Sequence, residues 1–150
     1  MFYDTDDTFI TINNRNKDKE KKLDKLKSTE EILDYSKKVI IDNYFFELLD
    51  ECKEISRVFV DSFKTLVLFV EYIKKLPKWS SLICTYEGLF VMNWRVANVI
   101  TVTLRFNTDY MVSYVIAKQK APNYYEDINW FRGTCYCLDV MEVIEDIVGK

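Results

Sequence analysis

Residues 82–118 read LICTYEGLFVMNWRVANVITVTLRFNTDYMVSYVIAK, and their pattern predicts a sheet. Val, Ile, Thr, Tyr and Phe are frequent in this stretch, and the hydropathy alternates with a period of two. We expect strands near Leu82–Tyr86, Leu89–Val96, Val99–Phe106 and Tyr110–Lys118. The breaks between them are too short for a parallel crossover, which needs about a dozen residues. The strands should therefore form an antiparallel meander.

The third predicted strand has one apolar side and one polar side. Apolar side chains alternate there with polar ones, in the order Ile100, Thr101, Val102, Thr103, Leu104, Arg105, Phe106. One face should be buried, and the other should meet water or a partner. Single-stranded nucleic acid could stack on Tyr110 or Tyr114 above Arg95 and Arg105, but so few residues in an acidic protein favour a plain solvated face.

The sequence before the sheet predicts helices. Ser28 and Glu31 form a capping-box pattern, so a helix should begin near Ser28. Apolar residues follow it at helical spacing, namely Ile32, Tyr35, Val39, Phe46 and Leu49. A second helix is indicated by Phe59, Phe63, Leu66, Val70 and Ile73, and Leu76-Pro77 should end it. Whether the two helices join between Asp50 and Glu54 stays open, because no Gly or Pro marks a break there.

Further elements are expected at both ends of the chain. After a loop at Ala121-Pro122-Asn123, a fifth strand is predicted at Trp130–Cys137, and LDVMEVIEDIVGK should form a helix that ends at Gly149. Its apolar side would carry Leu138, Met141, Ile144 and Val148. Residues 1–27 hold a charged tract that favours a solvated linker or a frayed helix start over a docking tail. The prediction is an α+β fold over residues 28–150, with N-terminal helices packed on a four- to five-stranded antiparallel meander and a short C-terminal helix.

The composition excludes several classes of function. The chain has 150 residues, 21 Lys plus Arg against 24 Asp plus Glu, and no His. Without a basic excess, duplex nucleic acid is an improbable partner. Without His, the usual general base, the Ser-His and Cys-His pairs and most zinc sites are missing. The three glycines stand apart, so no phosphate-binding loop exists. We expect no enzymatic activity and no cofactor; an enzyme using Tyr, Cys or carboxylates is the less favoured alternative.

The sequence also bears on location. The most apolar stretch, Val58–Ile73, is interrupted by Asp61, Lys64 and Glu71, so no membrane span is expected. The first residues are acidic where a secretory signal would be basic, which predicts a cytoplasmic protein.

Two cysteines are close enough in sequence to suggest a metal site. Cys135 and Cys137 are two residues apart on a predicted strand, which places both thiols on one face. A closed zinc site needs four donors, however, and Cys52 and Cys84 are the only other thiols. We therefore expect packing roles, reduced thiols and no bound metal.

The most suggestive side chains are four large aromatic residues after the fourth strand, Tyr124, Tyr125, Trp130 and Phe131. Aromatic residues and Arg dominate the binding energy of many interfaces. The alternative is that this segment folds across the open sheet edge and closes the core.

Residues 55–118 have a recognisable order of elements. A helix ending at Leu76-Pro77 leads to a turn at Gly88, a strand ending at Trp94, and two more strands, the last with Ser113-Tyr114. This pattern resembles a loose group of small uncharacterised bacterial and phage α+β proteins. The resemblance implies an architecture and a bacterial or phage origin, and it includes no catalytic motif.

Together these features predict a small cytoplasmic protein that binds another protein. Bacterial and phage immunity proteins, antitoxins and inhibitors of defence enzymes, such as anti-CRISPR proteins, act in this way by occlusion. The candidate partner-binding residues are Tyr124, Tyr125, Trp130, Phe131, Arg95 and Arg105. The alternative is a structural or assembly subunit that forms a homodimer or larger homo-oligomer through its aromatic patch.

Overall fold

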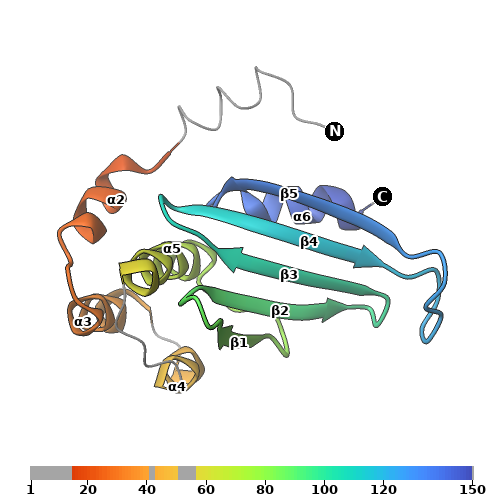
Figure 1. The fold of residues 1–150 in the computed structure, drawn as a ribbon, viewed down its shortest axis with the longest axis horizontal. Coiled ribbons are helices and arrows are strands. Elements are labelled where there is room, and N and C mark those ends of the chain that lie inside the picture. Colours follow the sequence, from red (N-terminus) through yellow and green to blue (C-terminus); the bar gives the residue numbers. More distant parts are fainter. Residues whose placement is uncertain (1–14, 41–42, 51–56, 150) are drawn as a thin grey trace.

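A five-stranded antiparallel sheet forms one layer of the fold (Figure 1). The computed structural model describes residues 15–40, 43–50 and 57–149. The strands are β1 Ser81–Cys84, β2 Phe90–Val96, β3 Ile100–Phe106, β4 Met111–Lys118 and β5 Asn129–Tyr136. They lie in the order β1-β2-β3-β4-β5, and each pairs antiparallel with the next. The predicted meander is confirmed, with its fifth strand.

The short turns have the backbone conformation that tight hairpins require. Ala97 and Asn98, between β2 and β3, have φ values of 53° and 60°. Two consecutive positive φ values are the signature of a type I′ turn, whose twist matches that of the flanking strands. Asp109 and Tyr110 have φ values of 55° and 61° at the next hairpin.

Helices precede and follow the sheet. They are α2 Lys17–Asp24, α3 Thr29–Val39, α4 Asn43–Asp50, α5 Arg57–Ile73 and α6 Val140–Val148. The predicted cap at Ser28 is confirmed, because its side-chain oxygen accepts the Glu31 N–H at 3.2 Å. The apolar series after Ser28 is divided between two helices, since Ile40 is extended with φ −117° and ψ 125°. Whether the chain turns between Asp50 and Glu54, which the sequence left open, concerns residues outside the described ranges.

α5 is the central helix of the core. Its Phe59 and Phe63 rings lie 4.9 and 5.5 Å from the ring of Phe90, and Phe69 lies 5.3 Å from Phe106. The helix ends at Ile73, slightly before Leu76-Pro77, where the sequence predicted its end. Within the described part of the chain, no helix combines the length and the apolarity needed to cross a membrane.

α5 and α6 pack on the same face of the sheet, which we call the core face. Phe90 and Phe106 point toward α5, and Lys118 on β4 donates its Nζ to the Ile147 carbonyl of α6 at 3.1 Å. The buried side of α6 carries Val140, Ile144 and Ile147, so only Ile144 of the four predicted residues is fully buried. Leu138, Met141 and Val148 pack at its margin.

α2 corrects the prediction of a solvated linker in the charged N-terminal tract. Leu23 is fully buried, and Glu20 is only 5 % exposed. The helix is capped by the Asn16 side chain, which accepts the Lys19 N–H at 3.3 Å. Buried Leu23, together with the bonds that Glu20 and Asp24 accept from the sheet, docks this charged helix against the core.

Candidate functional site

The face of the sheet opposite α5 and α6, which we call the open face, carries the candidate site. Its side chains are Ser81, Ile83, Val91, Asn93, Arg95, Thr101, Thr103, Arg105, Met111, Ser113, Val115, Ala117, Trp130, Arg132 and Thr134. All of them are exposed or half-buried, whereas their neighbours on the core face are mostly buried. The register also places Tyr136 on this face, opposite Met111, but Tyr136 is buried. Helices α5 and α6 therefore cover one side of the sheet only.

The register brings two of the predicted site residues into one row. Arg95 is opposite Thr101, which is opposite Ala117, which is opposite Trp130. Adjacent strands lie about 4.8 Å apart, so the Cα atoms of Arg95 and Trp130 are about 14 Å from one another. Arg105 lies two rows away on the same face, which a single partner surface can also reach.

The charge of the strands differs from that of the whole chain. None of the 24 acidic residues lies in β1–β5, whereas Arg95, Arg105 and Arg132 all project from the open face. Among the described residues, no ion pair joins any of these three arginines to a carboxylate. A protein with net charge −3 thus has a positively charged sheet face.

Arg95 is held in place by neutral acceptors. Its guanidinium donates to Thr101 Oγ1 at 3.0 Å, to the Asn98 carbonyl at 2.7 Å and to Gln119 Oε1 at 2.9 Å. These bonds fix the orientation of the group without neutralising it. A guanidinium positioned in this way loses little side-chain entropy when it binds an anion.

Arg105 has a looser attachment. Its Nε donates to Asn107 Oδ1 at 3.3 Å, and Asn107 in turn donates to Ser113 Oγ at 2.8 Å. The charge of Arg105 also acts on the carboxylate of Glu87, in the turn after β1. The pKa of Glu87 is lowered first by a hydrogen bond from Thr85 and to a smaller extent by the charge of Arg105.

Trp130 and Arg132 form a pair on β5. Trp130 is 55 % exposed, and the Arg132 guanidinium carbon lies 5.4 Å from the centre of its ring. Such a cation–π contact orders both side chains at the surface. The exposure of Trp130 argues against the alternative in which this residue closes the core. Arg132 is absent from the predicted site, although its spacing of two from Trp130 on an expected strand already placed both on one face.

The other aromatic residues after β4 are divided between surface and core. Tyr125 is 70 % exposed and Tyr124 is 40 % exposed, both in the loop that precedes β5. Phe131 points to the core face and packs against the core, with Lys118 Nζ 6.0 Å from its ring centre. The structure thus brings Arg95, Arg105 and Trp130 onto the open face, places the two tyrosines in the adjoining loop, and turns Phe131 away.

Tyr110 and Tyr114 are not part of the open face, which corrects their placement as candidate stacking residues. Tyr110 is 5 % exposed and Tyr114 is 6 % exposed. Tyr114 lies on the core face opposite Gly133, where a Cβ atom would overlap the phenol ring. Tyr136 shares the open face by register but is 1 % exposed. Among the described residues, Trp130 is therefore the only exposed aromatic side chain on that face.

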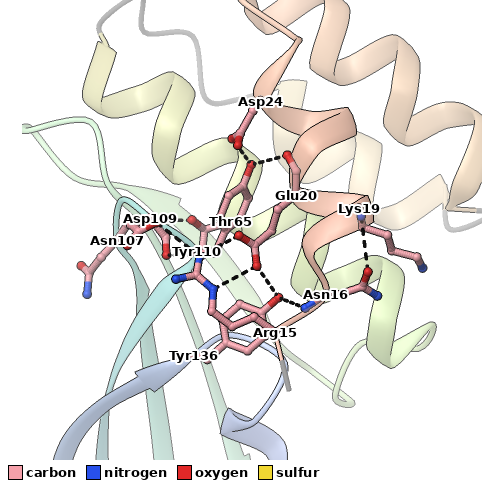
Figure 2. Close-up of polar contacts among 10 residues, drawn as sticks. All are labelled: Arg15, Asn16, Lys19, Glu20, Asp24, Thr65, Asn107, Asp109, Tyr110 and Tyr136. Carbon is pink, nitrogen blue, oxygen red and sulfur yellow. Dashed lines mark hydrogen bonds and ion pairs between the residues drawn. The ribbon is translucent and has the colours of Figure 1, made fainter. Parts of the chain in front are cut away.

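Tyr110 belongs to a polar cluster that fastens α2 to the end of the sheet, as Figure 2 shows. We call Arg15, Glu20, Tyr110 and Tyr136 the anchor cluster. Glu20 accepts hydrogen bonds from Arg15 Nη2 at 2.7 Å and Nε at 3.1 Å, and from the Tyr136 hydroxyl at 2.9 Å. The Tyr110 hydroxyl donates to Asp24 Oδ1 at 2.6 Å. Every polar group named here has a partner, as buried polar groups require.

Burial and neighbouring carboxylates shift the titration of this cluster. Burial is the largest cause that raises the pKa of Tyr110, and the bond to Asp24 adds to it. Burial also raises the pKa of Tyr136, and its bond to Glu20 acts in the same direction. Both phenols therefore stay protonated and act as hydrogen-bond donors well above neutral pH.

The anchor cluster borders a cavity of about 330 Å³ between α2, α5 and the turn before β4. Its lining residues are Glu20, Asp24, Asp61, Lys64, Thr108, Asp109 and Tyr110. Two of its carboxylates, Glu20 and Asp24, already accept bonds from Arg15, Tyr136 and Tyr110. These bonds favour a structural role for the two carboxylates over acid–base chemistry.

The thiols lie in the core. Cys135 and Cys137 are buried at the end of β5, and burial raises the pKa of Cys135 to about 12. Cys84 is half-buried on β1, and Cys52 lies outside the described residues. Within the described ranges, no three His, Cys, Asp or Glu side chains are grouped so that they could hold a metal ion.

No protein-family model, curated protein or solved structure matches this chain. The candidate site therefore stands on the geometry of the open face.

Proposed function

We propose that this chain is a protein-binding protein that acts by covering a surface of its partner with the open face. The observation that supports the proposal is the set of Arg95, Arg105 and Arg132, free of carboxylate partners among the described residues, beside the half-exposed Trp130. Arg and Trp are the residue types that most often dominate binding energy at interfaces. The partner surface that fits them is acidic.

The proposed biological class is an immunity protein, an antitoxin or an inhibitor of a defence enzyme, including anti-CRISPR-like inhibitors, in the bacterial cytoplasm. Proteins of this class act by occlusion and need a stable scaffold with one binding surface. A small domain whose sheet has one face covered by α5 and α6, and whose other face these helices leave open, has that form.

A protein partner is favoured over single-stranded nucleic acid by the aromatic residues. A nucleic-acid platform stacks successive bases on several exposed rings. Here Tyr110, Tyr114 and Tyr136 are buried, and Trp130 alone among the described residues has an exposed ring on the open face. The net charge of −3 also opposes the long-range attraction of a polyanion.

The test compares three baits in an extract of the source organism. One is the wild-type chain, one carries Arg95→Glu with Arg105→Glu, and one carries Lys37→Glu with Lys38→Glu on exposed positions of α3. Both variants change the net charge by the same amount, but only the arginine variant alters the open face. A difference between them therefore reports on that face and not on the overall charge. Captured proteins are identified by mass spectrometry, and the binding of the purified partner is then measured by calorimetry.

We expect a partner that binds the wild-type chain and the lysine variant alike. The arginine variant should bind it about 30-fold or more weakly, which corresponds to about 2 kcal/mol. Equal affinity of all three would refute the proposal. A wild-type chain that forms only a homo-oligomer in size-exclusion with light scattering, and retains no other protein, would favour the assembly-subunit alternative.

A further inference from the structure

The outer edge of β5 has backbone groups that no described residue pairs. β5 is the last strand of the sheet, and its inner edge pairs with β4. The Cys137 N–H donates to the Tyr110 carbonyl at 2.9 Å, so these two opposite residues form a hydrogen-bonded pair of the antiparallel ladder. Every second residue of β5 counted back from Cys137 then also bonds to β4. By the alternation of such a ladder, the N–H and C=O groups of Trp130, Arg132 and Thr134 point away from β4.

Among the described residues, this edge has little of the usual protection against strand addition, its charged side chain being Arg132. Natural edge strands are short, carry Lys or Pro, or are covered by a helix or loop. β5 has eight residues and neither Lys nor Pro. β1, at the opposite edge, has only four residues, and the Tyr44 hydroxyl bonds the carbonyl of Ser80 beside it at 3.3 Å. Of the two edges, β5 is the one suited to accept another strand.

The side chains beside the free backbone groups define the chemistry of an added strand. The same residues whose backbone groups point outward also place their side chains on the open face. A strand paired to β5 would place its own side chains about 5 Å, between Cβ atoms, from Trp130, Arg132 and Thr134. Arg132 has no carboxylate partner among the described residues, so a carboxylate on the added strand could form an ion pair with its guanidinium.

We propose that the β5 edge binds an extended acidic segment of the partner protein as a sixth strand, with a carboxylate opposite Arg132. This inference rests on the proposed function and specifies how the open face engages its partner. Backbone bonds to Trp130, Arg132 and Thr134 supply affinity, and the charge on Arg132 and the ring of Trp130 supply selectivity.

The test uses a synthetic peptide in which Glu alternates with Val, labelled for fluorescence anisotropy. One matched peptide replaces Glu with Lys, and another carries N-methyl groups at every second residue on the edge that would face β5. Binding is measured to the full chain and to its Arg132→Glu and Lys38→Glu variants. Hydrogen exchange followed by NMR reports the amides of Trp130, Arg132 and Thr134.

We expect the Glu peptide to bind, and to slow exchange at these three amides by about tenfold or more. The N-methylated peptide should lose binding because it cannot donate to the edge, and the Lys peptide should lose it by repulsion from Arg132. Arg132→Glu should weaken the Glu peptide by about tenfold, and Lys38→Glu should leave its affinity within about twofold. Arg132 is exposed, so the Arg132→Glu variant should have the same melting temperature as the wild-type chain.

Three results would overturn this inference. The first is a Glu peptide that fails to bind, and the second is binding that survives N-methylation. The third comes from repeating the exchange measurement without peptide at high chain concentration, and with an oligothymidylate: β5 amides that only these two additions protect. If the Glu peptide fails while the Arg95→Glu, Arg105→Glu bait still loses its partner, the sixth-strand inference falls and the proposed function stands. If the peptide behaves as expected while that bait keeps its partner, the edge site stands and occlusion by the open face falls.

Discussion

Replacing Tyr136 with Phe tests how α2 is held against the sheet. The hydroxyl donates to Glu20 Oε2 at 2.9 Å and accepts the Asn16 N–H at 3.0 Å, and Tyr136 is 1 % exposed. Phe keeps the ring in place, including its contact with Arg15 at 5.2 Å. The variant therefore removes two hydrogen bonds and little else.

The expected loss follows from these two bonds. A hydrogen bond to a charged group contributes about 1.5 to 3 kcal/mol, and a neutral one about 1 kcal/mol. Because Arg15 still donates twice to Glu20, we expect a loss of about 2 kcal/mol in the free energy of unfolding. For a chain of this length, such a loss lowers the melting temperature by roughly 4 to 8 °C.

Thermal and urea unfolding followed by circular dichroism measure the effect of Tyr136→Phe. Tyr125→Phe is the matched control, because Tyr125 is 70 % exposed, and its effect should stay within about 0.5 kcal/mol. If both variants melt within a degree of the wild-type chain, the anchor cluster does not stabilise the fold and our account of α2 is wrong.

The same variant has a signature in alkaline solution. The pKa of Tyr136 is raised in the folded chain, mainly by burial, so the unfolded chain releases this proton first, near pH 10. The stability supplied by Tyr136 is complete below pH 10 and falls above it by about 1.4 kcal/mol per pH unit. The difference between wild type and Tyr136→Phe should therefore shrink above pH 10. A difference that grows with pH would contradict the burial of this phenol.

Three further predictions concern packing and the thiols. Gly133→Ala should cost about 1 to 3 kcal/mol in a urea titration, because the new methyl group meets the Tyr114 ring; an unchanged midpoint would show that the ring can move. Leu23→Ala should cost about 2 to 5 kcal/mol by the same assay, since the side chain is fully buried, and a loss below 1 kcal/mol would mean that α2 is not docked. At pH 8, iodoacetamide labelling read by peptide mass spectrometry should modify Cys84 before Cys135, whose pKa is about 12, and the opposite order would refute the burial assigned to β5.

The meander and the caps could be predicted because their causes are local. The period of two in residues 100–106 reflects one face in water and one in the core, and the short breaks permit only antiparallel hairpins. Ser28 bonds an N–H three residues along the same chain, so its partner is visible in the sequence. The expected strands match the observed ones to within two residues at each end.

The sequence by itself therefore determined the strands, their antiparallel order, the helices that begin at Ser28 and precede Pro77, and the polar character of the open face. Only the tertiary structure decided that Leu23 and Glu20 dock a charged helix, because Tyr136, the partner that joins Glu20 to the sheet, is 116 residues away. It also decided that Tyr114 is buried and Trp130 exposed, and that Arg95 and Trp130 share a row across four strands. Strand register and helix docking join residues that are distant along the chain, whereas the hydropathy period and helix capping depend on residues close in sequence. A single sequence displays only the relations between such close residues.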